Sequence, residues 1–353
     1  MSNKHYIIPI FVPHEGCPHN CVFCNQSSIT GSTSKVNSFY VRNTIEDYLK
    51  TLPKHGATIE VSFFGGTFTA ISIEKQKELL EVAREYKLLN KINFIRLSTR
   101  PDYIDTDILD NLKEYSVDII ELGVQSMDSD VLIKSGRGHN EQDVILASEL
   151  IKKYGFTLGH QVMLGLPGDT FDKDVETTKK LITLKPSMVR IYPSLVIKDT
   201  PMEKMYTMGT YEPYSLIEAV EISKKLYGMF VSGNINVIRI GLQPTEEINV
   251  GKEIVAGPFH PSFRELVEGS LIKDMILEKL PNKLKTTIHI YVNPKDVSKL
   301  YSNKKMFFND IINAVPLANI MVVQKTSVER GSFILEYEDK VINMSINKFL
   351  VTS

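Results

Sequence analysis

The sequence predicts an α/β protein: a partial barrel of six strand–helix units, followed by a small C-terminal α+β domain. Three observations predict this. Short apolar runs alternate with segments of helical periodicity over the first 246 residues. These runs are the near-continuous apolar stretches expected of parallel strands that are buried on both faces. Polar and glycine-rich residues repeatedly follow the strands, at the edge where barrel enzymes place their active sites, which favours a barrel over a Rossmann-type sheet.

The expected elements follow in order along the chain. The strands cover residues 6–12, 59–64, 94–98, 117–124, 156–164 and 188–192, with a seventh strand-like run at 235–240. The helices cover 73–88, 106–115, a helical region ending at 154, 171–184 and 214–230. A further helix is expected to open at Thr44, because Asp47 stands three residues on as in a capping box. This order implies a parallel sheet with helices on its outer face.

After residue 246 the rhythm of the sequence changes. We expect a helix over 262–280, a strand over 286–292, a helix over 294–301, and strands over 320–325, 332–338 and 341–346. No low-complexity linker separates this part from the first. The sequence therefore predicts two domains, residues 1–246 and residues 247–353.

Composition and charge describe an ordinary globular protein. Hydrophobic residues make up 42% and charged residues 24%, and the formal net charge is −1, so no overall basic field gathers nucleic acid. No apolar run reaches the roughly 20 residues of a membrane helix, and residues 1–6 show no signal-peptide pattern. Clustered cysteines without a secretory signal indicate a reducing compartment. We expect a cytoplasmic protein without a membrane segment.

The three cysteines of the chain, Cys17, Cys21 and Cys24, are its only ones and are spaced C-x3-C-x2-C. Such short spacing places the thiolates on one loop, which can hold a cubic iron–sulfur cluster at three of its four irons. The fourth iron is then open to an oxygen or nitrogen ligand. The alternative is a structural zinc site completed by His14 or His19, although such sites generally use two separated pairs of ligands.

The run Cys17-x3-Cys21-Val22-Phe23-Cys24 resembles the signature of the radical S-adenosylmethionine (SAM) enzymes. The resemblance implies a 4Fe-4S cluster on the three cysteines, with the amino and carboxylate groups of SAM on the open iron. A reductant such as flavodoxin or ferredoxin would supply the electron that cleaves SAM to methionine and a 5′-deoxyadenosyl radical. The radical would then take a hydrogen atom from a substrate held above the barrel.

The same resemblance assigns SAM-binding residues to the ends of the strands. Gly65, Gly66 and Thr67 end the second strand, where residues without a β-carbon let the backbone offer carbonyls to an ammonium group. Many family members carry an acid where Thr67 stands. Gln125 can both donate to and accept from ribose hydroxyls, and Arg137 can fork onto the SAM carboxylate. Residues at matching positions have these roles in the branch that contains oxygen-independent coproporphyrinogen oxidase.

Two further SAM-binding candidates lie on later strands. Gln161 stands where that branch has an acid near the nucleoside, and barrel filling is its alternative role. Tyr192 ends the sixth strand, where relatives contact the adenine. For Arg137 the alternative is a surface ion pair. We expect His139 and His160 to be hydrogen-bonded structural histidines.

Five ordered motifs carry a narrower resemblance, to the radical SAM domain of the Elongator catalytic subunit, which modifies wobble uridines in tRNA with acetyl-CoA. They are residues 65–69, 99–104, 121–126, 137–139 and 191–193. In the second of them, Arg100 either faces the mouth of the barrel or pairs with Asp102. Ser98 departs from the pattern, because Elongator subunits carry an acid there.

The resemblance covers about residues 5–245 and omits two parts of Elongator subunits. The first cysteine, at residue 17, leaves no room for a basic N-terminal region, and the last hundred or so residues lack the glycine-rich loop of an acetyl-CoA site. We therefore expect a short relative without the acetyltransferase domain, and not a stand-alone acetylating enzyme.

Three hypotheses of function follow. The first is a radical SAM enzyme with an unassigned small-molecule or RNA substrate, and the second is a tRNA-modifying enzyme of the Elongator type. The third is a non-enzymatic protein stapled by an iron–sulfur cluster or zinc. The tail is locally basic and is either a solvated face or a docking patch for tRNA phosphates; its lysines are Lys283, Lys285, Lys295, Lys299, Lys304 and Lys305.

Overall fold

The computed structural model describes residues 4–12, 17, 19–25, 36–53, 56–244, 252–281 and 284–352. His14 and Lys283, which the sequence made candidates, lie outside these ranges. Within the described residues, no helix is long and apolar enough to cross a membrane.

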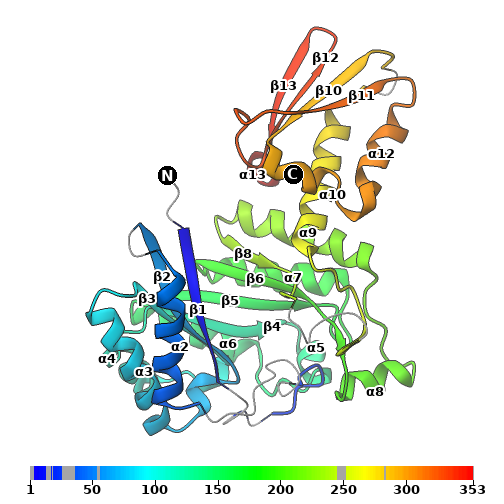
Figure 1. Ribbon diagram of the computed structural model, residues 1–353. Helices are drawn as coiled ribbons and strands as arrows, with labels where there is room; N and C mark the ends of the chain where they lie inside the picture. Colours follow the sequence, from blue (N-terminus) through cyan, green and yellow to red (C-terminus); the bar gives the residue numbers. More distant parts are fainter. Residues whose placement is uncertain are drawn as a thin grey trace.

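A seven-stranded parallel sheet forms the larger part of the molecule, in the order β1-β2-β3-β4-β5-β6-β8 (Figure 1). The strands are β1 (Lys4–Val12), β2 (Ala57–Gly65), β3 (Phe94–Thr99), β4 (Ile119–Gln125), β5 (Thr157–Leu164), β6 (Met188–Pro193) and β8 (Asn236–Ile240). Each strand pairs with the next one along the chain, with only the short β7 intervening. The predicted α/β half-barrel of parallel strands is confirmed.

The helices of this part follow the strands they connect. They are α2 (Ser38–Thr51), α3 (Ile73–Leu88), α4 (Thr106–Glu114), α5 (Ser129–Lys134), α6 (Glu141–Lys153), α7 (Phe171–Thr183), α8 (Pro201–Thr207) and α9 (Leu216–Ser232). The outward side chains of the strands, such as Ile10, Phe63 and Leu97, are fully buried in one hydrophobic core with them. Alternate positions, such as Ser98, Gln161 and Tyr192, are partly exposed on the inner face.

Helix α2 begins earlier than the capping pattern predicted. Asn37 caps it by accepting a hydrogen bond from the Tyr40 backbone N–H (2.9 Å). The predicted start at Thr44 is wrong, because the Thr44 hydroxyl lies inside the helix and donates to the Tyr40 carbonyl one turn back (2.9 Å). Val41 and Ile45, one helical turn apart, are both buried and extend the apolar face toward the N-terminus.

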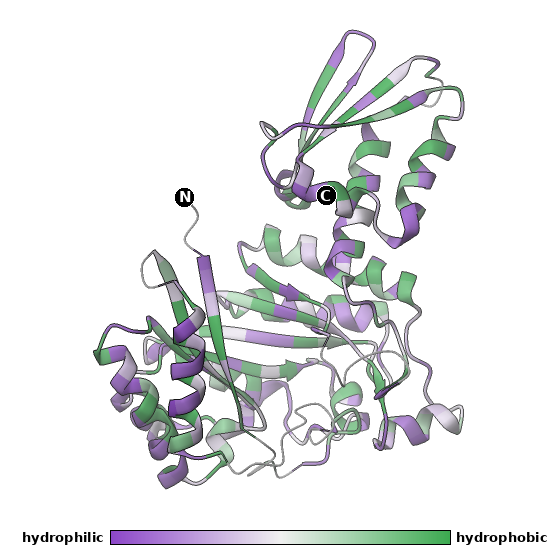
Figure 2. Ribbon diagram, in the orientation of Figure 1, coloured by the Kyte–Doolittle hydropathy of each residue, from purple (hydrophilic) through white to green (hydrophobic). Residues whose placement is uncertain are grey.

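The C-terminal part holds a second, four-stranded sheet in the order β11-β10-β12-β13. Its strands are β10 (Thr287–Val292), β11 (Asn319–Gln324), β12 (Ser332–Tyr337) and β13 (Lys340–Ser345), and its helices are α10 (Phe263–Lys279), α11 (Val297–Leu300), α12 (Met306–Ala314) and α13 (Ile346–Thr352). Hydrophilic and hydrophobic residues alternate along these strands (Figure 2), since β10 buries every second side chain. Helix α10 packs on α9, and Lys224 of α9 pairs with Asp274 of α10 at 2.6 Å.

Several short elements of the structure were not predicted. They are α8, α12, α13 and the two-stranded sheet of β7 (Val196–Ile197) and β9 (Ile254–Ala256). The helix expected over 294–301 is a 3₁₀ turn, Pro294–Asp296, followed by α11. The division into domains at residues 246 and 247 stays a prediction.

Candidate functional site

The cysteine loop follows β1 at the carboxyl edge of the half-barrel. None of the three cysteines forms a disulfide; Cys21 is buried and the other two are partly exposed. The backbone N–H of Cys24 donates to the Cys21 carbonyl (3.0 Å), which closes a turn between them. The loop is fastened at Val22, whose N–H donates to the Ser135 carbonyl (3.0 Å) and whose carbonyl accepts from the Met202 N–H (2.9 Å). The loop therefore rests on α5 and α8.

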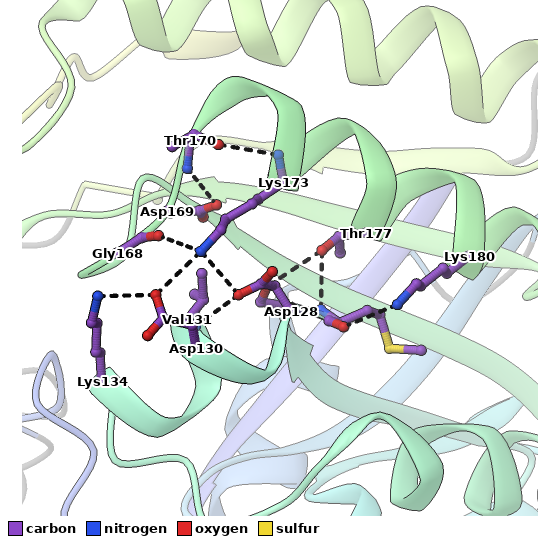
Figure 3. A network of polar contacts seen from close by, with 12 residues as sticks. Asp128, Asp130, Val131, Lys134, Gly168, Asp169, Thr170, Lys173, Thr177 and Lys180 are labelled. Atoms are coloured by element: carbon purple, nitrogen blue, oxygen red, sulfur yellow. Dashed lines mark hydrogen bonds and ion pairs between the residues drawn. The ribbon is translucent and has the colours of Figure 1, made fainter.

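Helix α5, which supports the loop, is itself tied to the first turn of α7 (Figure 3). The Lys173 ammonium group pairs with Asp128 (3.1 Å) and Asp130 (3.2 Å) and donates to the Gly168 carbonyl (2.8 Å). Asp128 also caps α5 by accepting from the Val131 N–H. The contact of Lys173 and the backbone of Val131 lowers the pKa of the Asp128 carboxyl, although its partial burial alone would raise it. These contacts hold α5 against the first turn of α7, and so support the cysteine loop that rests on α5.

The end of β2 meets the same loop. Gly65 has φ +110°, and a β-carbon there would lie 2.3 Å from the Val12 carbonyl oxygen, so only glycine fits. The Gly66 N–H donates to the same oxygen (3.0 Å). The buried hydroxyl of Thr67 donates to the Cys17 sulfur (3.6 Å). Thr67, where many relatives carry an acid, thus contacts a thiol in this chain.

Arg137 lies beside the second cysteine. Its Nη1 donates to the Cys21 sulfur (3.3 Å) and its Nη2 to the Gly123 carbonyl (2.5 Å). The residue is 6% exposed, so the alternative of a surface ion pair is wrong. Burial lowers the pKa of its guanidinium, and the Cys21 thiol acts in the opposite direction. Within the described residues its buried Nε has no hydrogen-bond partner.

Arg100 supports the backbone of Arg137. Its Nε and Nη2 bind the two carboxylate oxygens of Asp102 at 2.9 and 2.8 Å, and Nη2 also donates to the Arg137 carbonyl. Of the two roles considered for it, the pairing with Asp102 is confirmed. Its remaining nitrogen, Nη1, is buried without a partner among the described residues.

Three predicted nucleoside-side residues occupy the inner face. The side-chain amide nitrogen of Gln161 donates to the side-chain oxygen Oε1 of Gln125 (3.4 Å), so these two candidates lie together. Gln125 has φ +68°, next to a register shift between β4 and β5. Such a conformation disfavours a residue with a β-carbon and directs its side chain away from the normal alternation. The Tyr192 hydroxyl accepts from Arg190 (3.3 Å).

His139 and His160 are structural, as expected. His139 is buried against the Val124 carbonyl (3.2 Å) and His160 against the Ser148 hydroxyl (2.9 Å). Burial lowers the pKa of both rings to about 3, so both are neutral at physiological pH. Neither is placed to exchange a proton with a substrate.

A buried layer of charges below the site was missed from the sequence. Arg96 of β3 donates to Glu60 of β2 and to Glu121 of β4, both at 3.0 Å. Glu121 pairs in turn with Arg190 of β6 (2.5 Å), and His5 lies 3.2 Å from Glu60 at the other end. Their positions in the middle of otherwise apolar strands were the available signal.

The residues at the carboxyl edge fit a cofactor with a carboxylate group next to a thiolate-bound cluster. Cysteines that form no disulfide, a buried arginine whose Nε has no hydrogen-bond partner among the described residues, and the glycine-rich end of β2 meet there. In the described part of the chain, no three His, Cys, Asp or Glu side chains lie close enough to hold one metal ion. A cubic cluster makes a different demand, because each thiolate binds a separate iron.

The tail lysines that the sequence grouped together do not all form an open basic patch. Lys299 is largely buried and pairs with Glu268 (2.8 Å) and Asp296 (3.0 Å). Its charge is therefore neutralised within the protein.

An α/β half-barrel with a three-cysteine loop at its carboxyl edge defines a class of cofactor-dependent enzymes. Residues 11–182 match the radical SAM superfamily model and residues 186–273 match the radical SAM C-terminal domain model. The chain belongs to the radical SAM superfamily, whose members use a 4Fe-4S cluster and SAM. The predicted resemblance is confirmed, and the chain is an enzyme.

Individual relatives narrow the comparison. An uncharacterised protein of Methanocaldococcus jannaschii is 34% identical over 209 residues, which is 56% of this chain and 63% of that protein. A tRNA uridine(34) acetyltransferase of Methanocaldococcus infernus is 30% identical over 256 residues, 61% of this chain and 48% of that protein. The chain thus spans less than two thirds of the length of these relatives.

A solved structure shows the same relationship in three dimensions. An archaeal Elp3 from Methanocaldococcus infernus, with an N-terminal deletion, superposes with a TM-score of 0.61 at 25% identity. The match covers 78% of this chain and 64% of that one. The enzyme is therefore related to the Elp3 (Elongator complex protein 3) family.

Proposed function

We propose that this chain binds a 4Fe-4S cluster through Cys17, Cys21 and Cys24 and cleaves SAM reductively to start radical chemistry on a substrate. The observation that carries the proposal is the position of the cysteine loop, Arg137 and the glycine-rich end of β2 at one edge of the sheet. When bound, the reduced cluster supplies the electron that splits SAM into methionine and a 5′-deoxyadenosyl radical.

The residues of the chain divide the remaining work. Gly65, Gly66 and Thr67 offer backbone groups to the amino group of SAM, and Arg137 offers its Nε to the carboxylate. Gln125, Gln161 and Tyr192 contact the ribose and adenine of SAM on the inner face. The hydrogen bond between Gln161 and Gln125 and the partial exposure of Gln161 and Tyr192 support this assignment.

The substrate is held on the inner face of the half-barrel, opposite the helices. The similarity to tRNA uridine(34) acetyltransferase favours an RNA substrate of the Elongator type as the finer proposal. A small-molecule substrate is the alternative. A cytoplasmic reductant such as flavodoxin or ferredoxin completes the proposal, which places the enzyme in the cytoplasm.

Anaerobic reconstitution of the full chain tests this function. The wild-type protein should hold about four irons per chain and release 5′-deoxyadenosine from SAM under dithionite. Cys17→Ser, Cys21→Ser and Cys24→Ser should each lose both properties, whereas the tail variant Lys285→Ser should keep them. A colourless zinc protein that leaves SAM intact would refute the proposal and support the stapled-protein alternative.

RNA binding tests the finer proposal separately. A tRNA substrate predicts an affinity for unmodified tRNA that falls steeply as salt increases, because phosphate contacts release counterions. Binding that is absent at low salt, in a protein that cleaves SAM, would favour a small-molecule substrate.

A further inference from the structure

The charged layer on the inner face is a contiguous series of side chains from β1, β2, β3, β4 and β6, to which β5 contributes no carboxylate, lysine or arginine. Starting at β1, the order is His5, Glu60, Arg96, Glu121 and Arg190, and each neighbouring pair is in contact within 3.2 Å. Glu60, Arg96, Glu121 and Arg190 are at most 8% exposed. Buried charges are tolerated when each has an opposite partner. Within this series, Arg96 and Arg190 each lie next to a glutamate.

The series breaks at the last strand. Arg239 of β8 is the register partner of Arg190 of β6, so two cations stand on adjacent strands. Parallel strands are about 4.8 Å apart, and like charges opposite one another are destabilising. The register between β6 and β8 shifts just before this pair, which sets Arg239, and not Ile238, beside Arg190. Such bulges re-aim a side chain.

Among the described residues, no carboxylate pairs with Arg239. Across the described residues no hydrogen bond or ion pair involves its guanidinium, and the side chain is only partly exposed. Arg190, by contrast, is engaged by Glu121 and Tyr192, and its guanidinium lies 5.4 Å from the centre of the Phe64 ring. In the described part of the chain, Arg239 therefore lacks the anionic partner that Arg190 has.

The position of Arg239 relates it to the cofactor residues. Gln161, Arg190 and Arg239 are register partners across β5, β6 and β8, so they lie in one row across the sheet. Gln161 is one of the residues proposed to face SAM. A ligand group at Arg239 would thus lie two strands away from the nucleoside side of the cofactor, at the edge strand where the sheet is open.

We propose that Arg239, with Arg190 beside it, binds an oxyanion group of the substrate, either a phosphate or a carboxylate. This inference rests on the proposed function and adds the substrate's chemical class. The planar guanidinium groups suit such oxygens, because they form paired hydrogen bonds with them. The oxyanion of the substrate then lies beside Arg239 and balances its positive charge.

Anion binding to the cluster-loaded, SAM-bound full chain tests the proposal. Sodium phosphate and sodium succinate are titrated separately against sodium chloride at equal ionic strength, with the melting temperature and the dissociation constant as readouts. Phosphate, succinate or both should raise the melting temperature of the wild type beyond chloride. Stabilisation by phosphate alone identifies a phosphoryl group, and by succinate alone a carboxylate.

Two variants keep the test independent of folding. Arg239→Gln should raise the dissociation constant of whichever anion stabilises the wild type by about tenfold or more. Arg239→Glu should raise the melting temperature without any anion, because the new carboxylate pairs with Arg190, and should abolish the anion effect. Lys225→Glu, the same charge change on the exposed side of α9, should behave as the wild type.

The proposal is overturned if neither anion stabilises the wild type, or if Arg239→Gln binds the anion as tightly as the wild type. Iron content and 5′-deoxyadenosine release of the wild type are measured in the same preparations. Their loss refutes the proposed function, whereas a failure of anion binding with both intact refutes only the oxyanion site.

Discussion

On the outer face of the seven-stranded sheet, Ile10, Phe63 and Leu97 are fully buried beneath helices, whereas the inner face buries Glu60, Arg96 and Glu121 almost as completely. The faces differ in chemistry more than in depth. Apolar burial stabilises the outer face directly. Ion pairs on the inner face offset the cost of their own desolvation and add little net stability. We infer that the inner face is polar because it serves a ligand, and the following changes test that contrast.

The largest effect is expected from Arg96→Met, which leaves Glu60 and Glu121 buried without their shared cation. Breaking a buried pair on one side costs about 3–5 kcal/mol. Urea unfolding of the wild type and the variant measures the loss. The control is Arg42→Met, which breaks a partly exposed pair with Glu85 and should change stability only slightly. Equal losses of stability in the two variants would contradict the claim that leaving Glu60 and Glu121 without Arg96 carries the cost of an unpaired buried charge.

A second change compares the two faces with the same residue type. Phe63→Ala removes a fully buried outer-face ring and should destabilise the protein by about 3–5 kcal/mol. Phe11→Ala removes an inner-face ring that is 38% exposed and should destabilise it by much less. Both are measured by urea unfolding. A larger loss for Phe11→Ala would mean that the inner face is a packed core and not an open surface.

A smaller, pH-dependent effect is expected from His160 on the outer face. Its folded pKa of about 3 lies below the ordinary value of 6.5, so the unfolded chain binds the proton more tightly and stability falls as pH decreases from 6.5 toward 3. Between pH 7 and pH 5 this amounts to about 2 kcal/mol. His160→Gln should remove that part of the loss, measured by urea unfolding at both pH values.

The control for this experiment is His289→Gln on β10, which should keep the wild-type difference between pH 7 and pH 5. Comparison with the wild type is needed because the buried carboxyl of Asp174 makes stability change with pH in the opposite direction. Burial, and then the neighbouring Asp169, raise the pKa of Asp174 well above its ordinary value. An unchanged pH difference in His160→Gln would contradict a neutral, buried imidazole.

Sequence patterns predicted the fold where one signal dominated. The apolar runs located all seven strands of the first sheet, and helical periodicity gave α3 its observed bounds, Ile73–Leu88. The start of helix α2 was misplaced because Thr44 and Asp47 imitate a cap, whereas the helix is capped by Asn37. Helix α13 starts directly at the end of β13, with no turn residue to mark the change.

The site was predictable only where a motif names its residues. The cysteines, Gly65 and Arg137 were found because they belong to ordered motifs, and the structure brings them together. Other features could not be predicted because they depend on which strands are neighbours. They are the contact of Arg137 with Cys21, the bond of Arg100 to the Arg137 carbonyl, and the charged layer. Arg239 looked like any polar residue of an edge strand, and only its register with Arg190 sets it apart.

The central claim is that the three cysteines leave one iron of a cubic cluster open for SAM. The Mössbauer spectrum of the reconstituted, iron-57-labelled protein, recorded with and without SAM, tests it most directly. We predict that SAM shifts the signal of one iron in four and leaves the other three unchanged. A spectrum that SAM does not alter, or a reconstituted protein without a cubic cluster, would contradict the account.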